Sequence, residues 1–356
     1  MAMKKILSLL LVSVLMFSTV SALAADKVGV AMPTQSLPRW VRDGDLMKTK
    51  LEAAGFEVDL QFANNDVATQ VSQLENMISG GAKVLVVASI DGSALDTVLA
   101  TAKEAGIPII AYDRLLTDTK NVDYYTSFDN YKVGQIQGQY VIDKFDLSNE
   151  AVKGPFTIEF TAGSPDDNNA GLFFNGAFDL LKPYLDSGKL VCVSGQTQFE
   201  VVATPAWKSE TSQARMDNIL SAYYPDALTG GQKLDIALCS NDSTALGVTN
   251  SLVAAGFTKE NIPVITGQDC DIPNTKNMIA GLQAMSVFKD MRLLAEQTVT
   301  MVLDILAGKT PETNAVYANR VFDVPSFNCT PVFADVNNYK ELLLDSGFYT
   351  EADLAN

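Results

Sequence analysis

The sequence predicts an α/β protein built from two doubly wound, Rossmann-like domains. Short runs of β-branched and other apolar residues alternate with helical stretches along most of the chain. The runs are apolar at nearly every position, which is typical of parallel strands buried on both faces. The pattern restarts midway, and 356 residues exceed the usual size of a single core.

The first half is expected to form four strands with three helices between them. The strands are predicted at 28–32, 58–62, 84–88 and 107–112, and the helices at 40–54, 68–78 and 94–105. Gly55, Gly80 and Gly106 follow these helices, where a left-handed residue commonly ends a helix. Each strand–helix–strand unit is expected to be right-handed.

The same order returns after Gly134. Strands are predicted at 156–161, 190–194, 234–239 and 263–266, and helices at 169–181, 210–222 and 244–255. No low-complexity linker separates the two halves. We therefore expect short hinge segments between two domains that lie close together.

The first 24 residues have the pattern of a secretory signal peptide. Lys4 and Lys5 precede an apolar run over 6–17, and Ala22 and Ala24 have the spacing of a cleavage site. The apolar run is too short to span a bilayer, which takes about 20 residues. We expect cleavage near Ala24 and export of a soluble protein.

Composition excludes several classes of function. The chain has 26 basic and 42 acidic residues, a formal net charge of −16, so it lacks the basic surface that nucleic acids or anionic membranes require. It contains no histidine. This excludes Ser-His-Asp and Cys-His catalysis and histidine-ligated zinc.

The cysteines indicate neither a metal site nor a disulfide framework. Cys192, Cys239, Cys270 and Cys329 lie far apart, and no two have the spacing of a metal-binding pair. An exported protein could form one bridge, with Cys192 and Cys239 as the pair. Buried free thiols are the favoured state.

Polar side chains follow the predicted strands, at the sheet edge where ligands bind in such folds. They are Arg39 and Trp40, Asp113 and Arg114, the residues 164–169, Asn241 and Asp242, and Gln268 and Asp269. Carboxylate, amide and guanidinium groups can each bind two adjacent hydroxyls. Trp40 and Trp207, the only tryptophans, would offer flat apolar surfaces to the C–H face of a sugar.

Each of these residues also has an ordinary structural explanation. The tryptophans could simply pack in the core. Asp242 and either Asn168 or Asn169 could cap helices. Because the polar residues converge on one face of both halves, the pattern predicts a polar small-molecule site between two domains.

Segments covering most of the chain resemble, in order, the type I periplasmic sugar-binding proteins of ABC transporters, in the branch of the xylose and multiple-sugar receptors. They include LPRWVRDGD, IIAYDRL, SFDNYKVG, GSPDDNNA, CSNDSTALG, GQDCDIP and IAGLQAMSVFKD. The resemblance implies the periplasmic-binding-protein type I fold, with two parallel-sheet domains joined by a three-strand hinge.

The resemblance also implies a role for individual residues. Arg39 and Arg114 are expected to donate to ring and hydroxyl oxygens, and Asp113 to accept from hydroxyls. Lys289 resembles the lysine that contacts the sugar, and Trp207 the stacking wall. The predicted ligand-binding set is Arg39, Trp40, Asp113, Arg114, Asp167, Asn168, Asn169, Trp207, Asn241, Asp269 and Lys289.

The domain boundaries expected from the resemblance require three crossovers. The N-terminal domain is predicted to comprise 25–128 and 271–312, including the strand with Val287 and a helix over 291–306. The C-terminal domain is predicted to comprise 129–270 and 313–356.

The expected function is capture of a monosaccharide of the xylose, glucose, galactose or arabinose type between two closing domains. The periplasmic, monomeric receptor would deliver it to an ABC-transporter permease and also to a chemoreceptor. No catalysis, cofactor, metal or nucleic acid is expected.

Three other functions are alternatives to this one. A receptor for a small signalling molecule on the same fold is the main alternative. A glycosidase would need Asp113 and Asp269 as paired carboxylates, one with a raised pKa. A transcription regulator would need a DNA-binding headpiece where the signal peptide stands.

Overall fold

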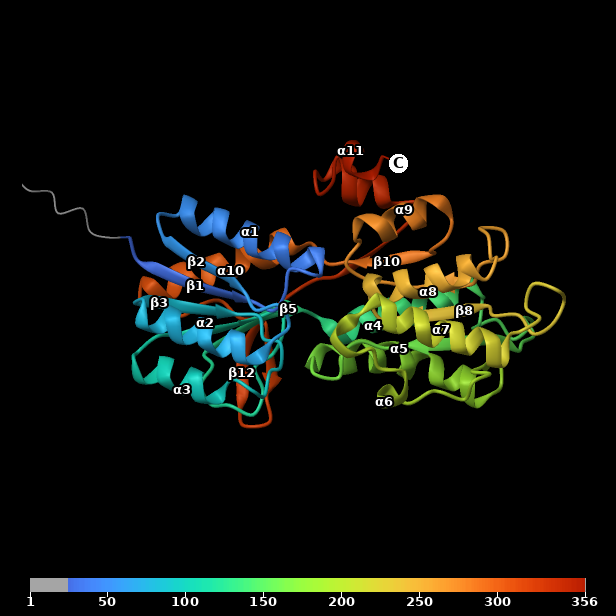
Figure 1. The fold of residues 1–356 in the computed structure, drawn as a ribbon, viewed down its shortest axis with the longest axis horizontal. Coiled ribbons are helices and arrows are strands. Elements are labelled where there is room, and N and C mark those ends of the chain that lie inside the picture. The colour runs from blue at the N-terminus through green and yellow to red at the C-terminus, as the bar shows by residue number, and fades with distance from the viewer. Residues whose placement is uncertain (1–24, 356) are drawn as a thin grey trace, which may run out of the picture.

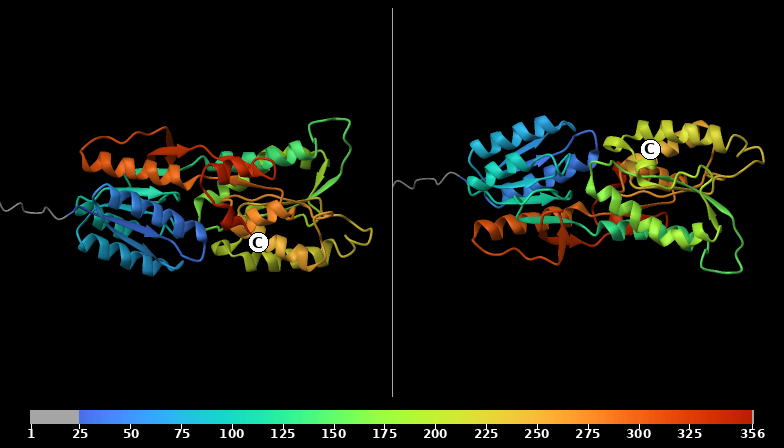
Figure 2. Two further views of the ribbon diagram at one scale, coloured as in Figure 1. Left: turned by 90° about the horizontal axis from the view of Figure 1, so that it is seen from above. Right: turned by 90° about the horizontal axis from the view of Figure 1, so that it is seen from below.

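The computed structural model describes residues 25–355, so the predicted signal peptide lies outside the described residues. Two lobes lie side by side along the long axis of the molecule (Figure 1). Each lobe contains a mainly parallel sheet covered by helices on both faces, as the other views also show (Figure 2). The predicted fold class is confirmed.

The first domain contains a seven-stranded sheet in the order β11-β12-β5-β4-β3-β1-β2, parallel except for the β11–β12 pair. Its strands are β1 (Lys27–Met32), β2 (Glu57–Phe62), β3 (Ala82–Val87), β4 (Ile109–Tyr112), β5 (Tyr124–Phe128), β11 (Ala315–Ala318) and β12 (Asp323–Cys329). Its helices are α1 (Pro38–Ala53), α2 (Val67–Ser79), α3 (Asp96–Glu104) and α10 (Met291–Leu306).

Two apolar layers cover the faces of this sheet. Leu74 and Met77 of α2 and Leu99 of α3 pack on one face. Met47 of α1 and Leu294 of α10 pack on the other. The strands are therefore buried on both sides, which explains why their sequences do not alternate.

The second domain contains a four-stranded parallel sheet in the order β7-β6-β8-β9. The strands are β6 (Phe156–Thr161), β7 (Leu190–Val191), β8 (Ile236–Cys239) and β9 (Val264–Ile265). The helices are α4 (Asn130–Lys144), α5 (Asn168–Asp186), α6 (Phe199–Val202), α7 (Ser209–Tyr223), α8 (Asp242–Ala254), α9 (Ile272–Ala280) and α11 (Glu351–Leu354), with short turns η1 (Pro205–Trp207) and η2 (Lys340–Asp345).

An antiparallel pair, β10 (Met285–Phe288) and β13 (Val332–Asp335), lies beside this sheet. A single parallel bridge between Gln268 and Val287 connects the pair to the segment after β9. The chain passes between the domains three times: from β5 to α4, from β10 to α10, and from β12 to β13.

The observed crossovers correct part of the predicted boundaries. Residues 271–288, including the strand with Val287, stay with the second domain, because β10 pairs with β13 and α9 lies beside α8 (Figure 1). Residues 315–329 belong to the first domain, because β12 pairs with β5 and extends its sheet. The sequence placed both segments in the opposite domain.

Smaller differences have local causes. Gly81, with φ of 81°, takes the left-handed position predicted for Gly80. The strand predicted over 190–194 ends at Val191, and the following Ser194 is bound instead by the Glu159 carboxylate. All four cysteines are free thiols. Among the helices of residues 25–355, none has both the length and the apolar character of a membrane span.

Candidate functional site

A cavity lined by residues of both domains lies between them. All predicted site residues except Asn168 line it. Its lining comprises Leu37, Arg39, Trp40, Asp113, Arg114, Asp167, Asn169, Phe173, Trp207, Asn241, Ser243, Gln268, Asp269, Asp271 and Lys289.

Asn168 does not belong to the cavity. Asp167 is the N-cap of α5, and its carboxylate accepts the backbone N–H of Asn169 at 2.9 Å. Asn168 is therefore the first residue of the helix, and its side chain is exposed to solvent. Asp167, in the extended conformation of an N-cap, and Asn169 both line the site, while Asn168 between them points out of it.

Arg39 is the centre of the charged network in the cavity. It lies in the first turn of α1, and its guanidinium bonds to Asp43 at 3.2 Å, to Asp269 at 3.4 Å and to Asp113. Burial alone would raise the pKa of Asp113, but the charges of Arg39 and Lys289 outweigh it and hold that pKa below its usual value. Asp113 is therefore a carboxylate acceptor at neutral pH.

Asp43 binds the Arg39 guanidinium from the side away from the cavity lining. Its other oxygen accepts the hydroxyl of Tyr112, the last residue of β4. Burial raises the pKa of Asp43 to about 6 even though Arg39 lowers it. Asp43 and Tyr112 do not line the cavity, so their contribution is to fix the direction of the Arg39 fork.

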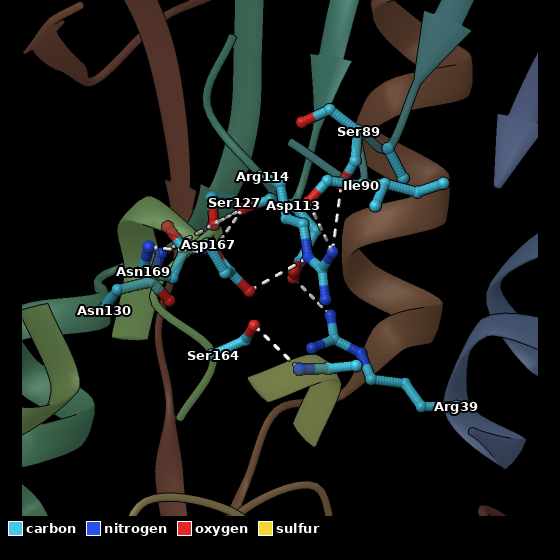
Figure 3. Close-up of polar contacts among 12 residues, drawn as sticks. Arg39, Ser89, Ile90, Asp113, Arg114, Ser127, Asn130, Ser164, Asp167 and Asn169 are labelled. Carbon is cyan, nitrogen blue, oxygen red and sulfur yellow. Dashed lines mark hydrogen bonds and ion pairs between the residues drawn. The ribbon is translucent and has the colours of Figure 1, made fainter. Parts of the chain in front are cut away.

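Arg114 and Asp167 form a second charged pair, which joins the two domains (Figure 3). Arg114 Nε lies 2.9 Å from Asp167 Oδ2, and Arg114 Nη1 donates to the backbone oxygen of Ser89 at 3.0 Å. Asn169 also crosses the interface, because its side-chain N–H donates to the carbonyl oxygen of Asp113 at 2.7 Å.

The backbone at Asp113 is in the left-handed region, with φ of 59°. Its carbonyl oxygen accepts from the hydroxyls of Tyr125 at 2.7 Å and Ser127 at 2.9 Å, in addition to Asn169. Such a conformation persists only where the surroundings fix it. The bonds to this carbonyl therefore hold the Asp113 carboxylate in the cavity.

Asp269 and Lys289 come from the second domain and the crossover after β10. Asp269 Oδ1 lies 3.0 Å from Lys289 Nζ and 3.4 Å from Arg39 Nη1. The Lys289 ammonium also lies 5.3 Å from the ring centre of Phe173. A carboxylate and two cations from different segments thus meet at one point of the cavity.

Two aromatic surfaces border these charges. Trp207 is in the left-handed region with φ of 57°, and its ring lies on Gly163, where an added Cβ would come within 1.9 Å of it. Phe173 meets this ring edge to face at 6.3 Å. The absence of a side chain at Gly163 is therefore what lets Trp207 occupy the wall of the cavity.

Trp40 has both of the roles that the sequence left open. It packs in the core of the first domain and lines the cavity. The guanidinium carbons of Arg39 and Arg114 lie 4.9 Å and 5.0 Å from its ring centre. Its ring thus helps to orient both arginines.

Asn241, predicted as a ligand contact, also takes the capping role that the sequence offered to Asp242. Its Oδ1 accepts the backbone N–H of Thr244 at 3.0 Å and caps α8, while the residue also lines the cavity. Trp207 Nε1 and Gln268 Oε1 are buried in the cavity lining and have no hydrogen-bond partner within residues 25–355. A buried donor and a buried acceptor are thus available to a ligand.

Sequence reasoning missed several residues of the site. Leu37, Phe173, Ser243 and Asp271 line the cavity without having been predicted as ligand contacts. Gln268, which the sequence placed at the ligand-binding edge but not in the predicted set, lines it too. Ser243 lies two residues after the predicted Asn241, and Gln268 directly precedes the predicted Asp269. Asp43 could have been found from its spacing of four residues after Arg39, which places both on one helix face.

The arrangement can bind a neutral polar molecule. Each of the three cations that line the cavity, Arg39, Arg114 and Lys289, is paired with a carboxylate of the lining, that of Asp113, Asp167 or Asp269. The proposed glycosidase pair does not fit, because both Asp113 and Asp269 are ion-paired with Arg39 and the pKa of Asp113 is lowered. Within the described residues, no cluster of side chains suits a metal ion.

The chain is similar in sequence to known periplasmic binding proteins. Residues 28–310 match the periplasmic binding protein domain. The multiple sugar-binding periplasmic receptor ChvE of Rhizobium radiobacter is 48% identical over 356 residues, which cover 98% of each chain. The D-xylose-binding periplasmic protein of Escherichia coli (strain K12) is 36% identical and covers 99% of this chain and 100% of its own.

Two solved structures show the same fold. An ABC transporter solute binding protein from Clostridium phytofermentans, with bound β-D-glucose, has 55% identity and a TM-score of 0.88 over 93% of this chain and 100% of its own. A carbohydrate transporter solute binding protein from Chloroflexus aurantiacus, in complex with D-glucose, has 30% identity and a TM-score of 0.83 over 93% of this chain and 99% of its own.

Proposed function

The chain belongs to the periplasmic binding protein family, and from this premise we propose that it is a solute-binding protein that captures a monosaccharide between its two domains. D-glucose and D-xylose are the first candidates, since relatives and solved neighbours are named for these sugars or hold them. Galactose and arabinose complete the proposed range. The protein acts by binding and not by catalysis.

The observation that carries this proposal is the composition of the cavity. Paired cations and carboxylates from both domains lie in the cavity together with the Trp207 ring. A neutral sugar presents hydroxyls at its edge and C–H groups on its faces, so it matches the charged groups and the ring together. Because each cation of the lining already has a carboxylate partner, a charged ligand would bring an unpaired charge into the cavity.

Each predicted residue then has a proposed role. Arg39 and Arg114 donate to the sugar, and Asp113 and Asp269 accept from its hydroxyls. Lys289 and Asn241 donate from the other side, and Trp207 stacks on the ring. Asp167, Asn169 and Trp40 act by holding Arg114, the Asp113 carbonyl and both guanidiniums, respectively.

Ligand capture is proposed to work through domain closure. A sugar that touches residues of both domains binds the closed form more tightly and so shifts the population toward it. The closed surface is then recognised by an ABC-transporter permease, and we extend the same proposal to a chemoreceptor. Both partners would bind a surface that forms only when the two lobes are in the closed arrangement.

The deciding experiment is thermal unfolding of the chain from residue 25 onward against D-glucose, D-xylose, D-galactose, L-arabinose and acyclic xylitol, followed by calorimetric titration. A ligand at 100 times its Kd adds about 2.7 kcal/mol of stability. We expect a large shift with at least one of the cyclic sugars. If none of them shifts the transition, the proposal fails, and the signalling-molecule receptor becomes the preferred function.

Export and oligomeric state are part of the same proposal. We expect the mature protein in the periplasm, with its N-terminus near residue 25, and a monomer in solution with and without sugar. N-terminal sequencing of the periplasmic fraction tests the first expectation, and light scattering tests the second. An uncleaved or cytoplasmic protein, or a stable dimer, would contradict the corresponding statement.

A further inference from the structure

The turn that carries Asp269 is held in an unfavourable backbone conformation. Asp269 has φ of 96° and Cys270 has φ of 51°, both in the left-handed region. Conformations of this kind in residues other than glycine are retained where neighbouring groups fix them. Because Asp269 contacts both Arg39 and Lys289, the geometry of this turn determines where a central carboxylate of the cavity lies.

Hydrogen bonds from outside the cavity fix the three peptide units of this turn. The N–H of Asp269 donates to Val287 O at 2.8 Å. The next two N–H groups donate to Ser286 Oγ at 3.1 Å and to Asp242 Oδ2 at 2.8 Å. The carbonyl oxygen of Cys270 accepts from two hydroxyls, those of Thr275 at 3.1 Å and Tyr349 at 2.8 Å.

Tyr349 differs from the other partners because it comes from the C-terminal segment. This segment follows η2 and lies on the second domain beside α9 (Figure 1). The Tyr349 side chain is 4% exposed. Burial raises the pKa of its hydroxyl well above the usual value, although Arg42 lowers it, so the hydroxyl remains a donor at neutral pH.

The Tyr349 hydroxyl also accepts a hydrogen bond from the first domain. Arg42 Nη1, on α1, donates to it at 2.5 Å, and the guanidinium carbon lies 4.4 Å from the ring centre. The guanidinium carbons of Arg42 and of Arg292, on α10, lie 5.5 Å and 5.2 Å from the ring centre of Phe348. The C-terminal segment therefore contacts two helices of the opposite domain.

Helix α1 thus reaches the Asp269 turn by two routes. Inside the cavity, Arg39 contacts the Asp269 carboxylate directly. Outside it, Arg42, three residues further along the same helix, reaches the Cys270 carbonyl through the Tyr349 hydroxyl. Both routes connect the two domains, and only the first involves residues that line the cavity.

We propose that Tyr349 and Arg42 are positioning residues for ligand binding: their hydrogen-bonded chain holds the left-handed turn in the geometry in which Asp269 binds, and does so when the two domains are together. This inference rests on the proposed sugar-binding function and adds a contribution from outside the cavity. The C-terminal segment would slow ligand release without touching the ligand.

The test is Tyr349→Phe, which removes the hydroxyl and keeps the ring that stacks on Arg42. The matched control is Tyr224→Phe, because Tyr224 is also a buried tyrosine of the second domain, is 3% exposed, and donates to Glu159 at 2.9 Å far from the turn. We expect Tyr349→Phe to weaken sugar binding about three- to tenfold, mainly through faster dissociation. Tyr224→Phe is expected to lower the unfolding temperature and leave affinity unchanged.

A double-mutant cycle separates a linked chain from two independent effects. The cycle compares the two single variants, Tyr349→Phe and Arg42→Lys, with the double variant. If Arg42 acts through Tyr349, the affinity of the double variant is expected to lie within about twofold of that of the weaker-binding single variant. Equal affinity of Tyr349→Phe and the wild type would overturn the inference, as would equal losses in both tyrosine variants or fully multiplicative effects in the cycle. A wild type that binds no monosaccharide would instead refute the proposed function and the inference together.

Discussion

The Asp269 carboxylate offers the sharpest test of the proposed site. Asp269→Asn removes its charge and keeps its size and one oxygen. It also suits the backbone, because asparagine tolerates positive φ better than other side chains do, and Asp269 has φ of 96°. Asp269→Ala would combine loss of charge with loss of volume and added strain, so the amide is the cleaner change.

The expected size of the effect follows from the partners of Asp269. Its Oδ1 lies 3.0 Å from Lys289 Nζ and 3.4 Å from Arg39 Nη1, and the Lys289 side chain is 2% exposed. A hydrogen bond to a charged group contributes about 1.5–3 kcal/mol, so sugar affinity is expected to fall about 10- to 150-fold. Unpairing the buried ammonium is expected to lower the free energy of unfolding by about 3 kcal/mol or more.

Calorimetric titration with the sugar that binds best measures the first quantity, and urea unfolding measures the second. The matched control is Asp118→Asn, since Asp118 also has positive φ, at 57°, and pairs with Arg320 at 2.7 Å on the surface. The control is expected to bind like the wild type and to lose less than about 1 kcal/mol of stability. If Asp269→Asn also binds like the wild type, the carboxylate does not accept from the ligand and the reasoning is wrong.

Three further changes test other parts of the structure. Gly163→Ala places a Cβ within 1.9 Å of the Trp207 ring and should weaken sugar binding at least tenfold in calorimetric titrations. The control Gly171→Ala, in open space on α5, should bind sugar like the wild type. Equal binding by both variants would contradict the role of the ring. Gly134→Ala brings a Cβ within 2.0 Å of Phe173 O between α4 and α5, and should cost about 1–3 kcal/mol of unfolding free energy; unchanged urea unfolding would contradict this close packing. Burial and the neighbouring Asp269 raise the pKa of Asp271 from its ordinary 3.8 to about 7, so its contribution to stability is complete below pH 4 and is lost as the pH rises through 7. Melting curves should therefore show Asp271→Asn gaining on the wild type by more than about 1 kcal/mol between pH 5 and 7, and parallel curves would show that Asp271 ionises normally.

The parts of the site that could be predicted are those governed by a local rule. Asp113 and Arg114 directly follow β4, and Asn241 lies two residues after β8. Lys289, next to the antiparallel strand β10, was predicted only from the family resemblance. A buried parallel strand is recognisable from its own residues, and the polar residues after it lie at the ligand-binding edge. Asn168 shows the limit of this rule, because α5 begins there and turns its side chain to solvent.

The rest depended on pairings that no short segment specifies. The sequence of residues 323–329 does not specify which domain's sheet they join, and the parallel pairing of β12 with β5 assigns them to the first. The same holds for the support of Asp269. Its turn is held by a hydroxyl 79 residues after Cys270, on a segment that reaches the turn only after the last crossover has returned the chain to the second domain. The carboxylate is thus visible in the sequence, whereas the geometry that lets it bind is set by where the chain ends its third passage between the domains.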